Sequence, residues 1–129
     1  MCRRLYIRKY QQNINEITYV DWQCKLNGIG GVAEGVEDIN QCIAIILQTQ
    51  KGSDPHRPTF GSDIMKYVDY PINVAKANII RETIDAINLW ETRVKINKTD
   101  IEINGTTILI KVEWTLANGN TSGTAEVTL

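Results

Sequence analysis

The clearest pattern of apolar positions lies near the middle of the chain and has the period of a helix. Between residues 38 and 52, apolar side chains recur at a spacing that places them on one helical face: Ile39, Cys42, Ile43, Ile46 and Leu47. Asp38 is a suitable N-cap, and Gln41 three residues later completes a capping-box pattern. Gly52 stands where a C-cap glycine is common. The pattern therefore predicts a helix that starts at Asp38 and ends before Gly52.

A second helix is predicted over residues 73–90. Its apolar stripe consists of Ala77, Ile79, Ile80, Ile84, Ala86, Ile87 and Trp90. Arg81 and Asp85 lie four residues apart on the polar side, which is the spacing of a helical ion pair. Between the two helices, Ser62 is a suitable cap for a short helix that buries Ile64, Met65 and Val68.

The last third of the chain alternates apolar and polar residues with the period of a strand. The phase of this alternation shifts at Asn97-Lys98, which indicates a bulge, and Asn104-Gly105 is a strong hairpin signal. Two further alternating runs follow: Ile108, Ile110, Val112, Trp114 and Leu116, then Ala125, Val127 and Leu129. A short strand is also predicted over residues 22–26. The fold class is therefore α+β, with central helices packed on a C-terminal antiparallel β-meander.

Composition and charge narrow the classes of function. The chain has 129 residues, of which 43% are hydrophobic and 22% charged, and its net charge of −1 gives no overall attraction for nucleic acid or anionic lipid. Cys2, Cys24 and Cys42 match no zinc or redox spacing, and the last two are predicted to be small core side chains. No apolar run is long enough to cross a membrane, and the start lacks a secretory signal. Synthesis in a reducing cytoplasm is therefore expected.

The start of the chain differs from the rest by its positive charge. Arg3, Arg4, Arg8 and Lys9 precede the first acidic residue. Two interpretations stay open: a frayed basic terminus, or an arm that docks on an acidic neighbour and is ordered only in an assembly. We expect residues 1–21 to form this segment and residues 22–129 to form a single domain.

Several short runs, taken in their order, resemble one protein family. They are residues 35–39 (GVEDI), 47–52 (LQTQKG), 57–61 (RPTFG) and 86–94 (AINLWETRV). Over residues 22–103 they resemble the baseplate wedge proteins of contractile phage tails, the W and gene-25 type. Related subunits occur in type VI secretion systems and R-type pyocins. Two departures stand out: Thr92 replaces the proline of the family's Trp-Glu-Pro-Arg, and Gly52-Ser53-Asp54 replaces its Gly-Glu-Arg.

The resemblance implies a structural role in the baseplate of a virion tail, made in the cytoplasm of a bacterial host. Such a subunit would dock on larger wedge proteins and offer β-strands that anchor the first ring of the tail sheath protein. Tail tube or hub proteins are further expected partners. No cofactor, metal, nucleic acid or membrane is expected, and the chain is not expected to be an enzyme.

The residues expected to bind partners fall into three groups. Glu91 and Arg93 are either a surface ion pair or a recognition pair, and the resemblance favours recognition. Arg57 is a second candidate. The last strand either closes its own sheet or accepts a neighbour's strand at an open edge, through Thr121, Thr124, Glu126 and Val127. Structural roles are assigned to Gly52, Pro58, Phe60, Gly61 and Trp90.

A peptidoglycan hydrolase of the tail is the alternative, because some members of this family have been described as lysozyme-like. Glycoside hydrolysis needs two carboxyl groups across a cleft, one of them with a raised pKa. Five acids are candidates by type, although spacing singles out no pair: Glu37, Asp38, Asp54, Asp63 and Glu91. The single histidine, His56, cannot form a zinc cluster by itself, and no catalytic residue is assigned.

Overall fold

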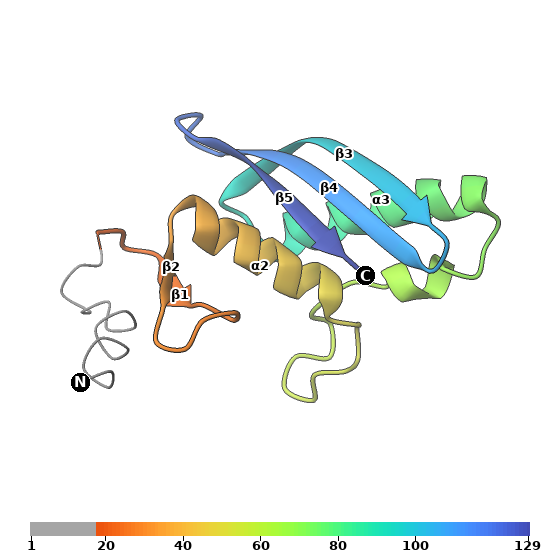
Figure 1. The fold of residues 1–129 in the computed structure, drawn as a ribbon, viewed down its shortest axis with the longest axis horizontal. Coiled ribbons are helices and arrows are strands. Elements are labelled where there is room, and N and C mark those ends of the chain that lie inside the picture. Colours follow the sequence, from red (N-terminus) through yellow and green to blue (C-terminus); the bar gives the residue numbers. More distant parts are fainter. Residues whose placement is uncertain (1–17) are drawn as a thin grey trace, which may run out of the picture. The chain divides into compact units, whose positions relative to one another are not determined.

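The computed structural model describes residues 18–129, so the expectations for the basic start lie almost entirely outside the described residues. The chain divides into two compact units, Met1–Gln41 and Cys42–Leu129. Along the chain, a two-stranded ribbon is followed by helical segments and then by three C-terminal strands (Figure 1). The α+β class predicted from the sequence is confirmed. No helix among the described residues is long and apolar enough to span a membrane.

In the first unit, a two-stranded ribbon is fastened to the start of a helix. Strand β1 (Trp22–Cys24) pairs antiparallel with β2 (Val32–Glu34), and α2 (Val36–Gln48) begins just after it. The Gln41 side chain donates to the Cys24 carbonyl at 2.8 Å and accepts from the Leu26 N–H at 3.1 Å. Gln41 therefore holds the ribbon loop and does not complete a capping box.

Two further predictions for this first unit are wrong. Helix α2 starts two residues before Asp38, which is buried in the first turn and is not the N-cap. Cys24, predicted to be a core residue, is exposed, as is Trp22 two residues earlier. The two side chains share one face of β1, and a two-stranded ribbon by itself offers no second layer to cover a face.

The second unit is built on a three-stranded antiparallel sheet in the order β3-β4-β5. The strands are β3 (Val94–Asn104), β4 (Thr107–Leu116) and β5 (Ser122–Thr128). Figure 1 shows α3 (Ile72–Trp90) running along the sheet, where it contacts β3. The inner face of β4 is fully apolar and buried at Ile108, Ile110, Val112 and Trp114. The predicted hairpin at Gly105 and the bulge between Ile96 and Lys98 are confirmed.

Helix α3 forms where the sequence predicts a helix, but the side of the helix that is buried differs from the predicted stripe. Arg81 Nε lies 3.8 Å from Asp85 Oδ2, so the predicted ion pair forms. The buried residues of α3 are Ala75, Ile79, Thr83, Ala86 and Ile87. Ala77 is exposed, contrary to the predicted stripe. Thr83 can be buried because its hydroxyl donates to the Ile79 carbonyl at 2.8 Å, which satisfies the polar group inside the helix.

The predicted short helix is a single 3₁₀ turn, η2 (Ile64–Tyr67). Ser62 does not cap it, because the Ser62 hydroxyl is buried and donates to the Leu47 carbonyl at 2.9 Å. Of the side chains predicted to be buried here, only Ile64 is, and Met65 and Val68 are exposed. One 3₁₀ turn aligns side chains every third residue, so it cannot bury the broader face that an α-helix would.

Candidate functional site

Glu91 and Arg93 lie where α3 ends and β3 begins. Two hydrogen bonds join the side chains: Arg93 Nε donates to Glu91 Oε1, and Arg93 Nη2 donates to Glu91 Oε2, both at 2.7 Å. The Arg93 backbone N–H also donates to Oε1, at 3.3 Å. The two side chains therefore form a bidentate pair, the strongest common geometry between these groups. This pair closes the turn from helix to strand within the chain itself.

The two members of this pair differ in exposure. The Glu91 side chain is 6% exposed, whereas that of Arg93 is 32% exposed. Arg93 Nη2 also lies 3.7 Å from Cys42 Sγ, so the guanidinium ties α2 to the junction. A contact between this junction and another protein would therefore be made through the exposed part of Arg93. Removal of Arg93 would leave a buried carboxylate without its counter-ion.

The loop between α2 and η2 is closed at its base by backbone hydrogen bonds. The Gly52 N–H donates to the Pro58 carbonyl and the Ser62 N–H to the Thr49 carbonyl, both at 2.9 Å. Gly61 has a φ of +104°, and an added Cβ would lie 2.2 Å from the Thr49 carbonyl oxygen, so only glycine fits there. Gly52 follows the last residue of α2 by four positions, so its predicted role as a helix C-cap is wrong.

An aromatic pair anchors this loop. Phe60 packs with Ile46 and Ala86 in a buried cluster, and its ring meets that of Trp90 edge-on, with centroids 5.1 Å apart. The Arg57 guanidinium lies 4.4 Å from the Phe60 centroid, a cation–π contact, and 3.4 Å from Asp54 Oδ2. Arg57 is thereby held in place on an exposed loop, in a position where another protein can reach it.

Strand β5 forms one edge of its sheet, and the pairing pattern shows which of its backbone groups are unused. Leu129 and Ile108 exchange both N–H···O bonds, and the Leu116 N–H donates to the Thr121 carbonyl. In an antiparallel pair such bonded positions alternate with non-bonded ones. The bonded positions of β5 are therefore residues 121, 123, 125, 127 and 129. The N–H and C=O groups of the others point away from β4: Ser122, Thr124, Glu126 and Thr128.

The side chains of β5 divide in the same way. The side chains of Ser122, Thr124, Glu126 and Thr128 are exposed, whereas Ala125 and Val127 are buried. Of the residues predicted for this edge, Thr124 and Glu126 therefore present backbone groups outward. Thr121 and Val127 use theirs to bind β4. Sequence reasoning missed Lys111 of β4, whose Nζ lies 3.2 Å from Glu126 Oε1. Lys111 stands at a polar position in the alternation of β4. This position points to Glu126 only when the register of β4 with β5 is known.

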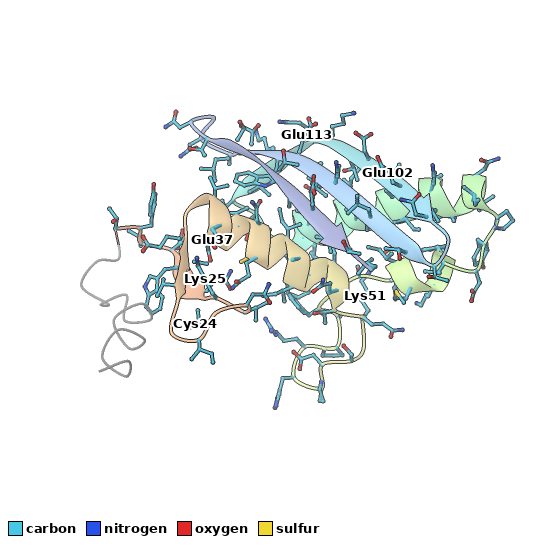
Figure 2. The ribbon with its side chains drawn as sticks, viewed as in Figure 1. Cys24, Lys25, Glu37, Lys51, Glu102 and Glu113 are labelled. Carbon is cyan, nitrogen blue, oxygen red and sulfur yellow. The ribbon has the colours of Figure 1, made fainter. Side chains whose placement is uncertain are left out.

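Four of the five acids considered for hydrolysis form ion pairs, and the fifth, Asp38, is buried. Figure 2 shows Lys25 beside Glu37, with Nζ and Oε1 2.8 Å apart, and Lys66 Nζ is 2.9 Å from Asp63 Oδ1. The pKa of Asp54 is lowered from its usual value, mainly because the His56 backbone N–H donates to its carboxylate, with a further contribution from Arg57. A lowered pKa is opposite to what a general acid requires. Asp38 is buried in the first turn of α2, and Glu91 binds Arg93.

Comparison with known proteins identifies the class. Residues 33–121, from β2 to the residue before β5, match the family model of the baseplate wedge protein gp25. The chain therefore belongs to this family of structural baseplate components of contractile tails, as its sequence motifs predict. Neither β1 nor β5 falls within the matched residues. No curated protein matches the chain significantly.

Solved structures of related machines share the fold. A proposed tail lysozyme from Geobacter sulfurreducens is 30% identical, with a TM-score of 0.65 over 72% of this chain and 87% of that one. A chain of the postcontracted pyocin R2 baseplate is 20% identical, with a TM-score of 0.60 over 74% and 98%. A chain of the anti-feeding prophage baseplate is 14% identical, with a TM-score of 0.55 over 85% and 80%.

Proposed function

We propose that this chain is a wedge subunit of a contractile injection machine and that its β5 edge takes up a strand from the tail sheath protein. The observation that supports this most directly is the row of outward backbone groups at Ser122, Thr124, Glu126 and Thr128. An open edge is a liability in a solitary protein but an attachment point in a subunit built to assemble. The shared strands would pass rearrangements of the baseplate to the first sheath ring.

Docking on larger wedge proteins would use two arginines outside β5. One lies at the junction of α3 with β3, and the other lies in the loop between α2 and η2. Arg93 presents part of its guanidinium beside the buried Glu91, and Arg57 is held on Phe60 in the exposed loop. A guanidinium fixed in this way recognises carboxylates or carbonyls with little further loss of freedom. Tube or hub proteins would be neighbours in the same assembly, which would form in the bacterial cytoplasm and end in the tail baseplate.

A proline scan of β5 tests strand uptake. The Thr124 N–H points outward, so Thr124→Pro should leave the pairing with β4 intact, whereas Ala125→Pro removes a hydrogen bond within the sheet. With the tagged protein captured from cells that carry the whole tail gene cluster, Thr124→Pro should lose the sheath protein. It should still fold, because its missing N–H lies on the side of β5 that faces away from β4. Undiminished sheath recovery with folded Thr124→Pro would refute strand uptake at β5.

A second candidate function, cleavage of peptidoglycan, is favoured only by the likeness to the proposed tail lysozyme. The ion pairs of Glu37, Asp54, Asp63 and Glu91 count against it. The purified protein incubated with peptidoglycan should release no soluble fragments. If fragments appear and disappear again in a variant of one of the five acids, the chain is a hydrolase.

A further inference from the structure

The outer face of the three-stranded sheet carries charges whose signs alternate from strand to strand. Asp100 of β3 lies in register with Lys111 of β4, and Lys111 lies in register with Glu126 of β5. Glu126 Oε1 lies 3.2 Å from Lys111 Nζ, yet the Glu126 side chain remains 56% exposed. This ionic row therefore runs negative, positive, negative, and it stops at the free edge on a negative charge.

The neighbouring row on the inner face is apolar over the same strands. Ile101 lies in register with Ile110, and Ile110 with Val127, and all three side chains are buried. Cross-strand neighbours stabilise a sheet when their charges are opposite or when both are apolar, and like charges directly opposite each other destabilise it. A strand that continues the sheet beyond β5 meets an exposed carboxylate on one face and an apolar row on the other.

We propose that the β5 edge selects an incoming strand that carries a lysine or arginine beside Glu126 and an apolar residue beside Val127. This inference rests on the strand uptake proposed above and adds the chemistry of the partner strand. The basic residue would extend the ionic row to a fourth strand with alternating sign. Because Glu126 is exposed, its contribution is to choice among strands, and the backbone bonds supply most of the affinity.

A second copy of β5 lacks this chemistry. In the antiparallel register of greatest overlap, each Glu126 faces Thr124 of the other copy, so no cation completes the row. When the two strands slide by one repeat in one direction, the two Glu126 carboxylates face each other directly, which is unfavourable. In the other direction each Glu126 faces Ser122, which again supplies no cation. The same residue that favours a basic strand thus disfavours edge-to-edge pairing of identical subunits.

Two synthetic strands provide the test. One is Val-Thr-Val-Lys-Val-Thr-Val, and the other has Glu in place of the central Lys. Each is titrated into the full-length protein while hydrogen exchange of individual amides is followed by NMR. Protection of the outward amides of Thr124 and Glu126 reports that a strand has been added at this edge, because the Ala125 amide is already bonded to β4.

We expect the Lys strand to protect these amides with an affinity on the order of fivefold higher than the Glu strand at low salt, and the difference to shrink as salt is added. Glu126→Lys should invert the order of the two probes. Glu102→Lys is the matched control, since Glu102 is exposed on β3, at the opposite edge of the same sheet (Figure 2). It changes the net charge equally and should leave the order unchanged.

The contrary outcomes separate the two proposals. If both probes protect the amides equally and Glu126→Lys changes nothing, strands add at β5 but Glu126 does not select them. If neither probe protects these amides, strand uptake itself fails. Protection without any probe that grows with protein concentration would assign the edge to a second copy. Tighter binding of a peptide of residues 3–10 would assign it to the basic start of another copy of this chain.

Discussion

The junction at Glu91 and Arg93 and the edge at β5 both contain an acidic residue with a basic partner. The two acidic residues differ in exposure, because one is buried and the other faces solvent. Glu91 is buried and receives its hydrogen bonds from Arg93, two residues along the chain. Glu126 is exposed, and its partner Lys111 comes from the neighbouring strand. The first pair joins helix to strand within the fold, whereas the second ends an ionic row at an edge strand.

The position of an ion pair in the fold therefore determines whether the pair contributes mainly to folding stability or mainly to recognition. A buried bidentate pair contributes to folding, because each member would be costly without the other. An exposed cross-strand pair contributes little to folding and can serve recognition instead. The energetic contrast between the two regions is therefore open to direct measurement.

The largest expected effect is at the junction. Arg93→Ala should lower the free energy of unfolding by about 3 kcal/mol, because it leaves the Glu91 carboxylate buried without a counter-ion. Unfolding by urea measures this. Arg81→Ala is the control, since Arg81 lies in an exposed pair with Asp85 and should cost less than about 1 kcal/mol. Equal losses in the two variants would remove the distinction between a folding pair and a surface pair. Lost wedge assembly in an Arg93 variant counts as lost docking only where the variant is folded.

A smaller effect is expected on the inner side of β5. A Cβ at Gly123 would lie 2.6 Å from Cζ2 of the buried Trp114, so Gly123→Ala should cost about 2 kcal/mol through overpacking. Ser122→Ala, at an exposed position one residue earlier, should leave the unfolding midpoint nearly unchanged. If Gly123→Ala is tolerated equally well, the inner side of the edge strand is not closely packed and the edge is open on both faces.

At Glu126 the effect on stability should be smaller again. Glu126→Gln removes the exposed pair with Lys111 and should change the free energy of unfolding by less than about 1 kcal/mol, and by less still in high salt. Thermal unfolding at two salt concentrations measures both. A loss as large as that of Arg93→Ala would show that the edge pair, like the junction pair, belongs to folding.

The smallest effect concerns pH, at a half-buried carboxylate outside both regions. The pKa of Asp54 is lowered from 3.8 in the folded chain, chiefly by the His56 N–H. Its contribution to stability is therefore fully present above pH 3.8 and is lost as the pH falls from there through the lower folded value. Asp54→Asn should flatten this acid limb of the stability curve slightly. An unchanged limb would mean that the loop does not favour the ionised form.

Local signals in the sequence predict most of the second unit and little of how its charges are used. Alternation, the Asn104-Gly105 turn and the phase shift at Asn97 are sufficient to place β3, β4 and the bulge. The environment of Glu91 could not be predicted, because two charges two residues apart can point outward or fold onto each other. Lys111 and Glu126 are fifteen residues apart in the sequence, and only the register of β4 with β5 joins them. The buried side of α3 was misplaced because its middle turn includes Thr83, a polar residue that bonds within the helix.

The bulge in β3 has a consequence that can be expressed as the parity of residue numbers. Before the bulge, the even-numbered Val94 and Ile96 face the helical side, and after it the odd-numbered Ile101 does. Asn97 supplies the extra position, and its side chain donates to the Thr115 hydroxyl at 2.6 Å. If Asn97 took an ordinary paired position, the parity would not change, and Lys98, Asp100 and Glu102 would turn inward. One unpaired position in β3 thus decides whether Asp100 lies in the outer row with Lys111 and Glu126 or faces the core.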